Sequence, residues 1–147
     1  MNDGLRRTSD SLILRGLKST SIFSHLDDST LLDLSENARV VLFPSNEIIV
    51  REGEPSDSLF IIVNGIVAVK KIIQDQPDKI YAYLLPGSTF GEVGILENKP
   101  RSATVQALTD VEAIEFARET FINILNTYPA VAIEMAKLLG HYLTETN

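Results

Sequence analysis

Residues 90–104 read Phe-Gly-Glu-Val-Gly-Ile-Leu-Glu-Asn-Lys-Pro-Arg-Ser-Ala-Thr and concentrate more binding chemistry than any other stretch of the chain. Glycine allows backbone N–H groups to come close to a ligand, and a short helix that begins at such a turn presents its positive end to an anion. Arg101 follows Glu92 by nine positions, and an arginine side chain binds phosphate oxygens in a bidentate manner. The stretch, called the cassette below, therefore predicts a site for a phosphate ester.

Glu92 is the unexpected member of this set, because a carboxylate beside a phosphate site repels the ligand. The conflict disappears if the carboxylate has a separate role and accepts a hydrogen bond from a sugar hydroxyl group. A phosphate group next to a ribose indicates a nucleotide.

The composition is typical of one globular domain that spans residues 1–147. Of these residues 44% are hydrophobic, which is enough for one packed core. The absence of cysteine excludes disulfide bonds and thiolate metal sites. We expect a cytoplasmic protein without a membrane segment, because the sequence has no apolar signal segment and no apolar run of membrane-spanning length. The net charge of −7 argues against non-specific binding to nucleic acid.

The hydrophobic period divides the chain into three segments. Residues 1–37 predict N-terminal helices, residues 38–117 alternate as β-strands do, and residues 118–147 return to a helical period. Pro129 is expected to open the last helix as its first residue. Apart from the turns between strands, the cassette is the one insertion within residues 38–117 that does not read as a strand.

The N-terminal segment predicts two helices. The first begins at Ser9 or Asp10, and Gly16 is expected to weaken or end it. The second begins after Asp27 or Asp28, because aspartate at such a position accepts a hydrogen bond from the first turn of a helix.

The middle segment predicts many short strands separated by turns. Asn64-Gly65 and Thr109-Asp110 are expected to form hairpin turns between consecutive strands. Short strands at regular spacing are typical of an antiparallel β-roll or jelly-roll barrel. We therefore expect a mainly β fold with flanking α-helices. The expected strands are residues 40–43, 47–50, 58–63, 66–73, 80–85, 104–108 and 111–117.

These residues together resemble the cyclic-nucleotide-binding domain family, which includes the catabolite activator protein, the regulatory subunits of protein kinase A and cyclic-nucleotide-gated channels. Residues 90–105 are similar to the phosphate-binding cassette of that family over its whole length. The resemblance covers about residues 20–140. Further matches are Arg51-Glu52-Gly53-Glu54, Leu59-Phe60-Ile61-Ile62-Val63-Asn64-Gly65 and Leu85-Pro86-Gly87.

The resemblance implies a role for each polar residue of the cassette. Arg101 is expected to pair with the cyclic phosphate and Glu92 to accept the ribose 2′-hydroxyl group. The backbone N–H groups of Gly91, Glu92 and Ala103 and the hydroxyl group of Ser102 are expected to contact the ligand as well. The resemblance implies no cofactor beyond the cyclic nucleotide, which is a regulatory ligand.

The nucleotide base is expected to lie against the strands. By their position along the chain, Val69, Tyr81 and Ala82 face the purine, and the ring of Tyr81 is able to stack on it. Ser102 resembles the residue of the catabolite activator protein more than the alanine of the kinase subunits. We therefore expect cyclic AMP to be favoured over cyclic GMP.

The favoured function is a binding module that senses a cyclic nucleotide and relays occupancy through its C-terminal helices. The recipient is a protein partner, a second copy of the chain docked through the C-terminal helix, or an output domain that the chain lacks. We expect no DNA binding by this chain alone, because Glu134, Lys137 and Glu145 are the only acidic or basic residues after Pro129. An alternative is an interaction scaffold whose degenerate cassette binds no ligand.

An enzymatic function is not expected. A metal-dependent cupin enzyme needs a cluster of histidine and carboxylate ligands on strands, and His25 and His141 lie outside the strand region. Within the cassette, neither Glu92 nor Ser102 has a histidine nearby to activate it for hydrolysis. The sequence thus predicts no catalytic residue and no metal ligand.

Overall fold

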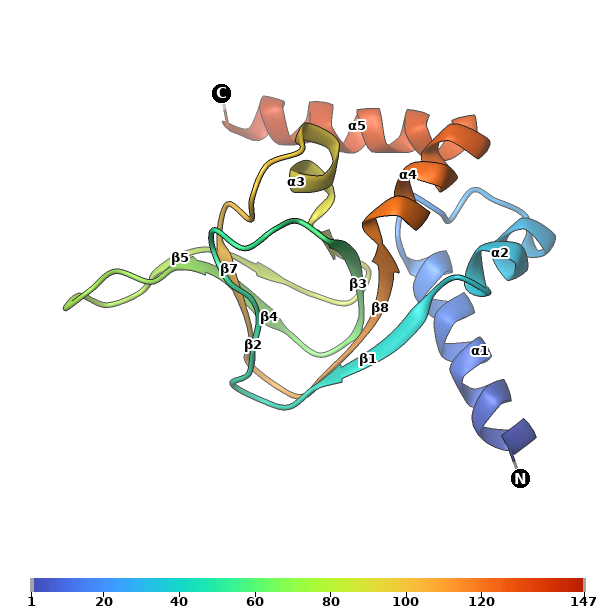
Figure 1. Cartoon of the computed structure of the whole chain (residues 1–147), viewed down its shortest axis with the longest axis horizontal. Helices are drawn as coiled ribbons and strands as arrows, with labels where there is room; N and C mark the ends of the chain where they lie inside the picture. Colours follow the sequence, from blue (N-terminus) through green and yellow to red (C-terminus); the bar gives the residue numbers. More distant parts are fainter. Residues whose placement is uncertain (1, 147) are drawn as a thin grey trace.

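The computed structural model describes the backbone of residues 2–146 and the side chains of residues 10–141. Within this part of the chain, eight strands form two four-stranded antiparallel sheets, and helices precede and follow them (Figure 1). The predicted antiparallel jelly-roll fold with flanking helices is confirmed, as two facing sheets and not as a closed barrel.

One sheet has the strand order β1-β8-β3-β6 and the other has the order β2-β7-β4-β5. The strands are β1 (Arg39–Phe43), β2 (Ile48–Val50), β3 (Ser58–Asn64), β4 (Val67–Lys71), β5 (Lys79–Leu84), β6 (Thr89–Phe90), β7 (Thr104–Ala107) and β8 (Val111–Ala117). The helices are α1 (Asn2–Ser19), α2 (Asp28–Ser35), α3 (Glu92–Glu97), α4 (Arg118–Thr127) and α5 (Pro129–Thr146).

Four connections of two to four residues carry the chain from one sheet to the other. The connections β1 to β2, β3 to β4, β5 to β6 and β7 to β8 each join strands of different sheets. The predicted hairpins at Asn64-Gly65 and Thr109-Asp110 are therefore wrong, because these residues turn the chain without pairing the strands that flank them. Gly65 has a φ of +98°, and a Cβ atom there would lie 2.4 Å from the carbonyl oxygen of Asp110. Glycine thus allows two of these turns to touch.

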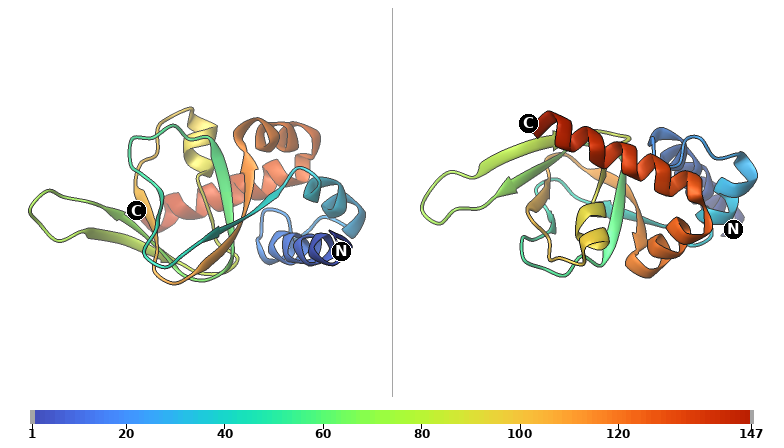
Figure 2. Two further views of the ribbon diagram at one scale, coloured as in Figure 1. Left: turned by 60° about the horizontal axis from the view of Figure 1, so that its bottom comes forward. Right: turned by 90° about the horizontal axis from the view of Figure 1, so that it is seen from above.

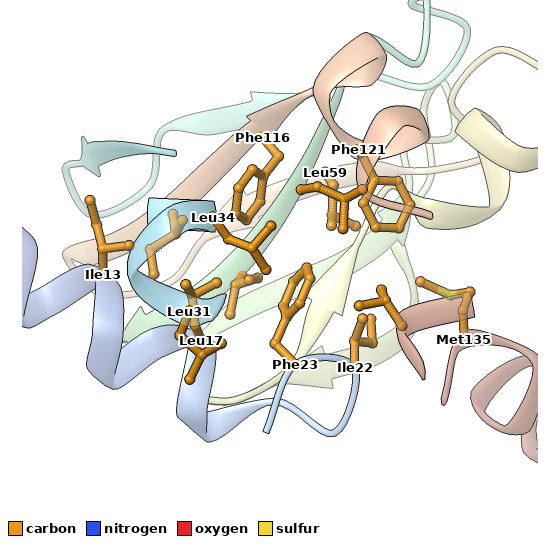
Figure 3. Packing of buried hydrophobic residues seen from close by; sticks show 14 of the residues in the cluster. Ile13, Leu17, Ile22, Phe23, Leu31, Leu34, Leu59, Phe116, Phe121 and Met135 are labelled. Carbon is orange, nitrogen blue, oxygen red and sulfur yellow. The ribbon is translucent and has the colours of Figure 1, made fainter. Parts of the chain in front are cut away.

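Strand β3 is buried on both faces and separates two hydrophobic cores. Phe60 and Ile62 belong to a cluster between the sheets, whereas Leu59, Ile61 and Val63 belong to a cluster beneath the helices. Successive side chains of a strand point to opposite faces, which explains why β3 reads as an unbroken apolar run. Figure 3 shows the second cluster, in which the labelled helical residues include Leu17, Leu31, Phe121 and Met135.

The flanking helices follow the predicted pattern at most of their ends. Asp27 caps α2 and accepts a hydrogen bond from the backbone N–H of Thr30 at 2.8 Å, as expected. Pro129 is the first residue of α5, which runs from α4 back along the molecule toward the end where β5 lies (Figures 1 and 2). His141 is exposed, and the side chain of Tyr142 lies outside the described residues.

Helix α1 differs from its prediction. It begins at Asn2 and continues through Gly16 to Ser19, whereas the sequence predicted a later start and an end near Gly16. Gly16 is buried against the sheet, where a Cβ atom would lie 2.2 Å from Cδ1 of Ile114 and 2.8 Å from Cγ2 of Val63. Glycine at this position therefore allows the helix to approach the sheet closely.

We expect Gly16→Ala to destabilise the fold by about 1–3 kcal/mol, the usual cost of overpacking a core. A loss of stability would indicate close packing at Gly16, because alanine in an open helix position is favoured over glycine by about 1 kcal/mol. Gly140→Ala in α5 is the matched control, since a Cβ atom there meets no atom within 4 Å. Urea denaturation of both variants measures the effect, and a Gly16→Ala variant as stable as the parent protein would contradict the close approach.

Candidate functional site

A pocket of about 290 Å³ lies between the cassette and the inner face of the β2-β7-β4-β5 sheet. Its volume is close to the lower limit of about 300 Å³ for small-molecule sites. One wall is apolar and comes from the four strands of that sheet, namely Val50, Val69, Ala82, Leu84 and Val105. The other wall comes from residues 89–94, residues 101–103 and Ser56.

Two of the three residues expected at the base line the apolar wall. Val69 of β4 pairs with Ala82 of β5 on one side and with Val105 of β7 on the other. The structure does not bring Tyr81 into the pocket. Its side chain is 51% exposed, its ring lies 5.5 Å from Nζ of Lys79, and the register between β4 and β5 shifts beside it.

Gly91 brings the backbone of the cassette close to its arginine. It precedes α3 with a φ of +100°, a left-handed conformation that side chains rarely adopt. A Cβ atom at Gly91 would lie 2.5 Å from Nη1 of Arg101 and 2.6 Å from the carbonyl oxygen of Ser58. Glycine is therefore required both by the turn and by the neighbouring guanidinium group.

Arg101 is buried, with 8% of its surface exposed. Its Nε and Nη1 atoms have no hydrogen-bond partner among the described residues. Burial lowers the pKa of Arg101, and the carboxylates of Asp57, Glu54, Glu115 and Glu92 oppose this shift. Because the ordinary pKa of arginine is so high, the guanidinium group keeps its charge at every accessible pH.

A stacked pair of aromatic rings lies next to the guanidinium group. Cζ of Arg101 lies 6.0 Å from the centroid of the Phe60 ring, a distance at which a cation is attracted to the face of the ring. Phe60 in turn stacks on Phe90, with the ring centroids 4.9 Å apart. Both rings belong to the hydrophobic cluster between the sheets, so the charged group borders that cluster.

Glu92 is the first residue of α3 and is 4% exposed. A carboxylate at the start of a helix is favoured by the helix dipole. Glu92, Ser102 and Ala103 all line the pocket together with Gly91 and Arg101. The structure therefore brings together all five cassette residues singled out from the sequence.

Sequence analysis missed five residues of the lining that lie outside the cassette. Val50, Leu84 and Val105 are ordinary strand residues without a chemical signature, and they reach the pocket only because β2, β7, β4 and β5 are neighbours in one sheet. Ser56 and Thr89 are buried polar residues of the lining. Their position beside the matched family motifs was the one available signal.

Among residues 10–141, whose side chains the structure describes, no three histidine, cysteine, aspartate or glutamate side chains come together as metal ligands. No helix in the described part of the chain is long and apolar enough to cross a membrane.

Comparisons with known proteins agree with this geometry. The sequence model of the cyclic nucleotide-binding domain matches residues 40–128. The CRP-like cAMP-activated global transcriptional regulator of Mycobacterium tuberculosis (strain ATCC 25618 / H37Rv) is 27% identical over 131 residues, which are 89% of this chain and 58% of the relative. This chain therefore spans less than two thirds of that relative.

Two crystal structures have a similar fold. The catabolite activator protein of Thermus thermophilus superposes with a TM-score of 0.79 at 26% identity, over 86% of this chain and 60% of that protein. The regulatory domain of Toxoplasma gondii PKA, solved with cAMP, gives a TM-score of 0.70 at 28% identity, over 78% of this chain and 44% of that one. With residues 40–128 matched, from the second residue of β1 to the end of α4, this chain belongs to the cyclic nucleotide-binding domain family.

Proposed function

We propose that this chain is a sensor that binds a cyclic nucleotide in the pocket beside Arg101 and releases it unchanged. The observation that carries the proposal is the buried guanidinium group, whose Nε and Nη1 atoms have no hydrogen-bond partner among the described residues. A buried donor without an acceptor is costly, and an anionic ligand supplies the missing acceptors. A cyclic phosphodiester carries one negative charge, which matches the one guanidinium group that lines the pocket.

The neighbouring residues have complementary roles in this proposal. Arg101 binds the cyclic phosphate, and the backbone N–H groups of Gly91, Glu92 and Ala103 and the hydroxyl group of Ser102 add hydrogen bonds. The Glu92 carboxylate accepts the ribose 2′-hydroxyl group, so the sugar separates this acid from the phosphate. The arrangement resolves the repulsion that a carboxylate would otherwise exert on an anionic ligand.

The apolar wall supplies a surface for the base. Val69 and Ala82 belong to a strip of small and branched side chains that offers a flat face but no charged group. We favour cyclic AMP over cyclic GMP, because the Mycobacterium relative is cAMP-activated and the Toxoplasma domain was solved with cAMP. Tyr81 has no role at the base in this proposal, since it does not line the pocket.

The signal leaves through α4 and α5 in this proposal. Phe121 of α4 and Met135 of α5 are packed in the cluster on β3 and β8, so a displaced cassette has a packed route to both helices. Ile133 of α5 is 56% exposed and marks a surface for a recipient. The recipient is a partner protein, a second copy of the chain, or an output domain.

Arg101→Lys tests the phosphate contact. Lysine keeps the positive charge but lacks the bidentate fork, so we expect cyclic AMP to bind about ten- to a hundredfold more weakly, as for the loss of hydrogen bonds to a charged group. Isothermal titration calorimetry with cyclic AMP and cyclic GMP measures both affinities. Arg15→Lys on the exposed face of α1 is the matched control. Equal affinities for all three proteins would refute the contact, and no binding to the parent protein at millimolar nucleotide would refute the function.

Glu92→Gln tests the sugar contact by comparison of two ligands. We expect cyclic AMP to bind about tenfold more weakly to the variant, because a charge-assisted hydrogen bond is lost. The affinity for 2′-deoxy cyclic AMP, which has no 2′-hydroxyl group, should change much less. A competition assay with both ligands gives the ratio. If the substitution weakened both ligands equally, Glu92 would not be the residue that reads the sugar.

A further inference from the structure

The connection between β2 and β3, residues 51–57, is hydrogen-bonded to the cassette. The backbone N–H of Arg101 donates to the carbonyl oxygen of Glu54 at 2.8 Å, and the N–H of Gly53 donates to the carbonyl oxygen of Arg101 at 2.9 Å. The N–H of Glu52 donates to Oγ1 of Thr104 at 3.1 Å. The end of the cassette that carries the guanidinium group is therefore held by the backbone of this connection.

Ser56 contacts the middle of the cassette through its side chain. It is 5% exposed, and its hydroxyl group donates to the carbonyl oxygen of Lys99 at 2.7 Å. It also lies directly against α3, since a Cβ atom added to Gly94 would lie 2.0 Å from Oγ and 2.8 Å from Cβ of Ser56. Ser56 thus fixes both the distance of α3 from the connection and the path of the chain after α3.

The next residue contacts a different helix. The carbonyl oxygen of Asp57 accepts the backbone N–H of Arg118, the first residue of α4, at 2.7 Å. Ala117, which precedes α4, offers no side-chain cap, so this backbone bond takes the place of one. Adjacent Cα atoms are only about 3.8 Å apart. Two successive residues therefore connect the cassette on one side with the start of α4 on the other.

We propose that Ser56 is a positioning residue for the nucleotide site and that Ser56-Asp57 couples the cassette to α4. Ser56 acts by holding α3 in place, and this in turn places Gly91 and Arg101. Without its hydrogen bond, part of the ligand-free population has a displaced cassette, and the apparent affinity falls with the competent fraction. The affinity part of this inference rests on the proposed function, whereas the mechanical part concerns the ligand-free protein.

Ser56→Ala removes the hydroxyl group without adding volume. In the ligand-free protein we expect faster amide hydrogen exchange in residues 92–101 and in the first turn of α4. With cyclic AMP we expect about fivefold weaker binding, the equivalent of one neutral hydrogen bond. Ser45→Ala is the matched control, because it removes a hydroxyl-to-carbonyl bond of the same kind, to Leu108 at 2.9 Å, from the turns at the other end of β3. Ser45→Ala should change neither the amide hydrogen exchange of these two segments nor the affinity for cyclic AMP.

Amide hydrogen exchange tests the role of Ser56-Asp57 in the ligand-free protein, whether or not cyclic AMP binds. If Ser56→Ala and Ser45→Ala gave the same exchange in both segments, the positioning role would be refuted. If exchange rose in residues 92–101 but not in α4, the coupling through Asp57 would be refuted. Absence of cyclic AMP binding by the parent protein would instead refute the proposed function and leave the exchange result to stand by itself.

A compensating pair of substitutions tests the contact between Ser56 and α3. Gly94→Ala should abolish nucleotide binding or lower the thermal midpoint, although alanine normally favours a helix. Adding Ser56→Gly removes the two nearest atoms to the new methyl group and leaves the carbonyl oxygen of Lys99 at 3.1 Å. The double variant should therefore recover thermal midpoint and affinity relative to Gly94→Ala alone. A double variant no better than Gly94→Ala would overturn the contact as the determinant of the position of α3.

Discussion

Arg101 carries a positive charge at a position where 8% of its surface is exposed and where two of its nitrogen atoms have no hydrogen-bond partner among the described residues. Burial of a charge without good hydrogen-bond geometry is expensive. Carboxylates, Asp57 and Glu54 foremost, supply a balancing field, and the Phe60 ring lies beneath the guanidinium group. The charge is therefore compensated at a distance, while its hydrogen-bonding capacity stays available for an anion.

Small residues make this placement possible. Gly91 adopts a left-handed conformation and leaves room for the guanidinium group, and Gly94 leaves room for Ser56. The connection of residues 51–57 then holds the middle and the C-terminal end of the cassette. An apolar wall that comes from the β2-β7-β4-β5 sheet faces the cassette across the pocket. A ligand with an anionic end and a flat apolar end suits the pocket.

The sequence predicted those features that depend on local chemistry. The cap at Asp27, the start of α5 at Pro129 and the family itself are confirmed, because each depends on residue types at a fixed spacing. The features that were missed depend on tertiary packing. Gly16 was expected to weaken or end its helix, but the helix continues through it. The absence of a side chain there allows the helix to pack closely against the sheet. Asn64-Gly65 looks like a hairpin turn, and only the pairing of distant strands shows that it changes sheets.

In the pocket, too, the residues of a local motif could be predicted, whereas those brought in by tertiary packing could not. The five cassette residues come together as the motif indicated, whereas the wall that contains Val50 and Val105 depends on which strands are neighbours. The roles of Arg101 and Glu92 toward a ligand stay predictions.

The most direct test of the central claim follows the Nε–H group of Arg101 by NMR spectroscopy during addition of cyclic AMP. Its signal is assigned by its loss in Arg101→Lys. If an anion completes the hydrogen bonding of the buried guanidinium group, this signal shifts on saturation and its exchange with solvent slows. A signal that stays unchanged at saturating cyclic AMP would contradict the account.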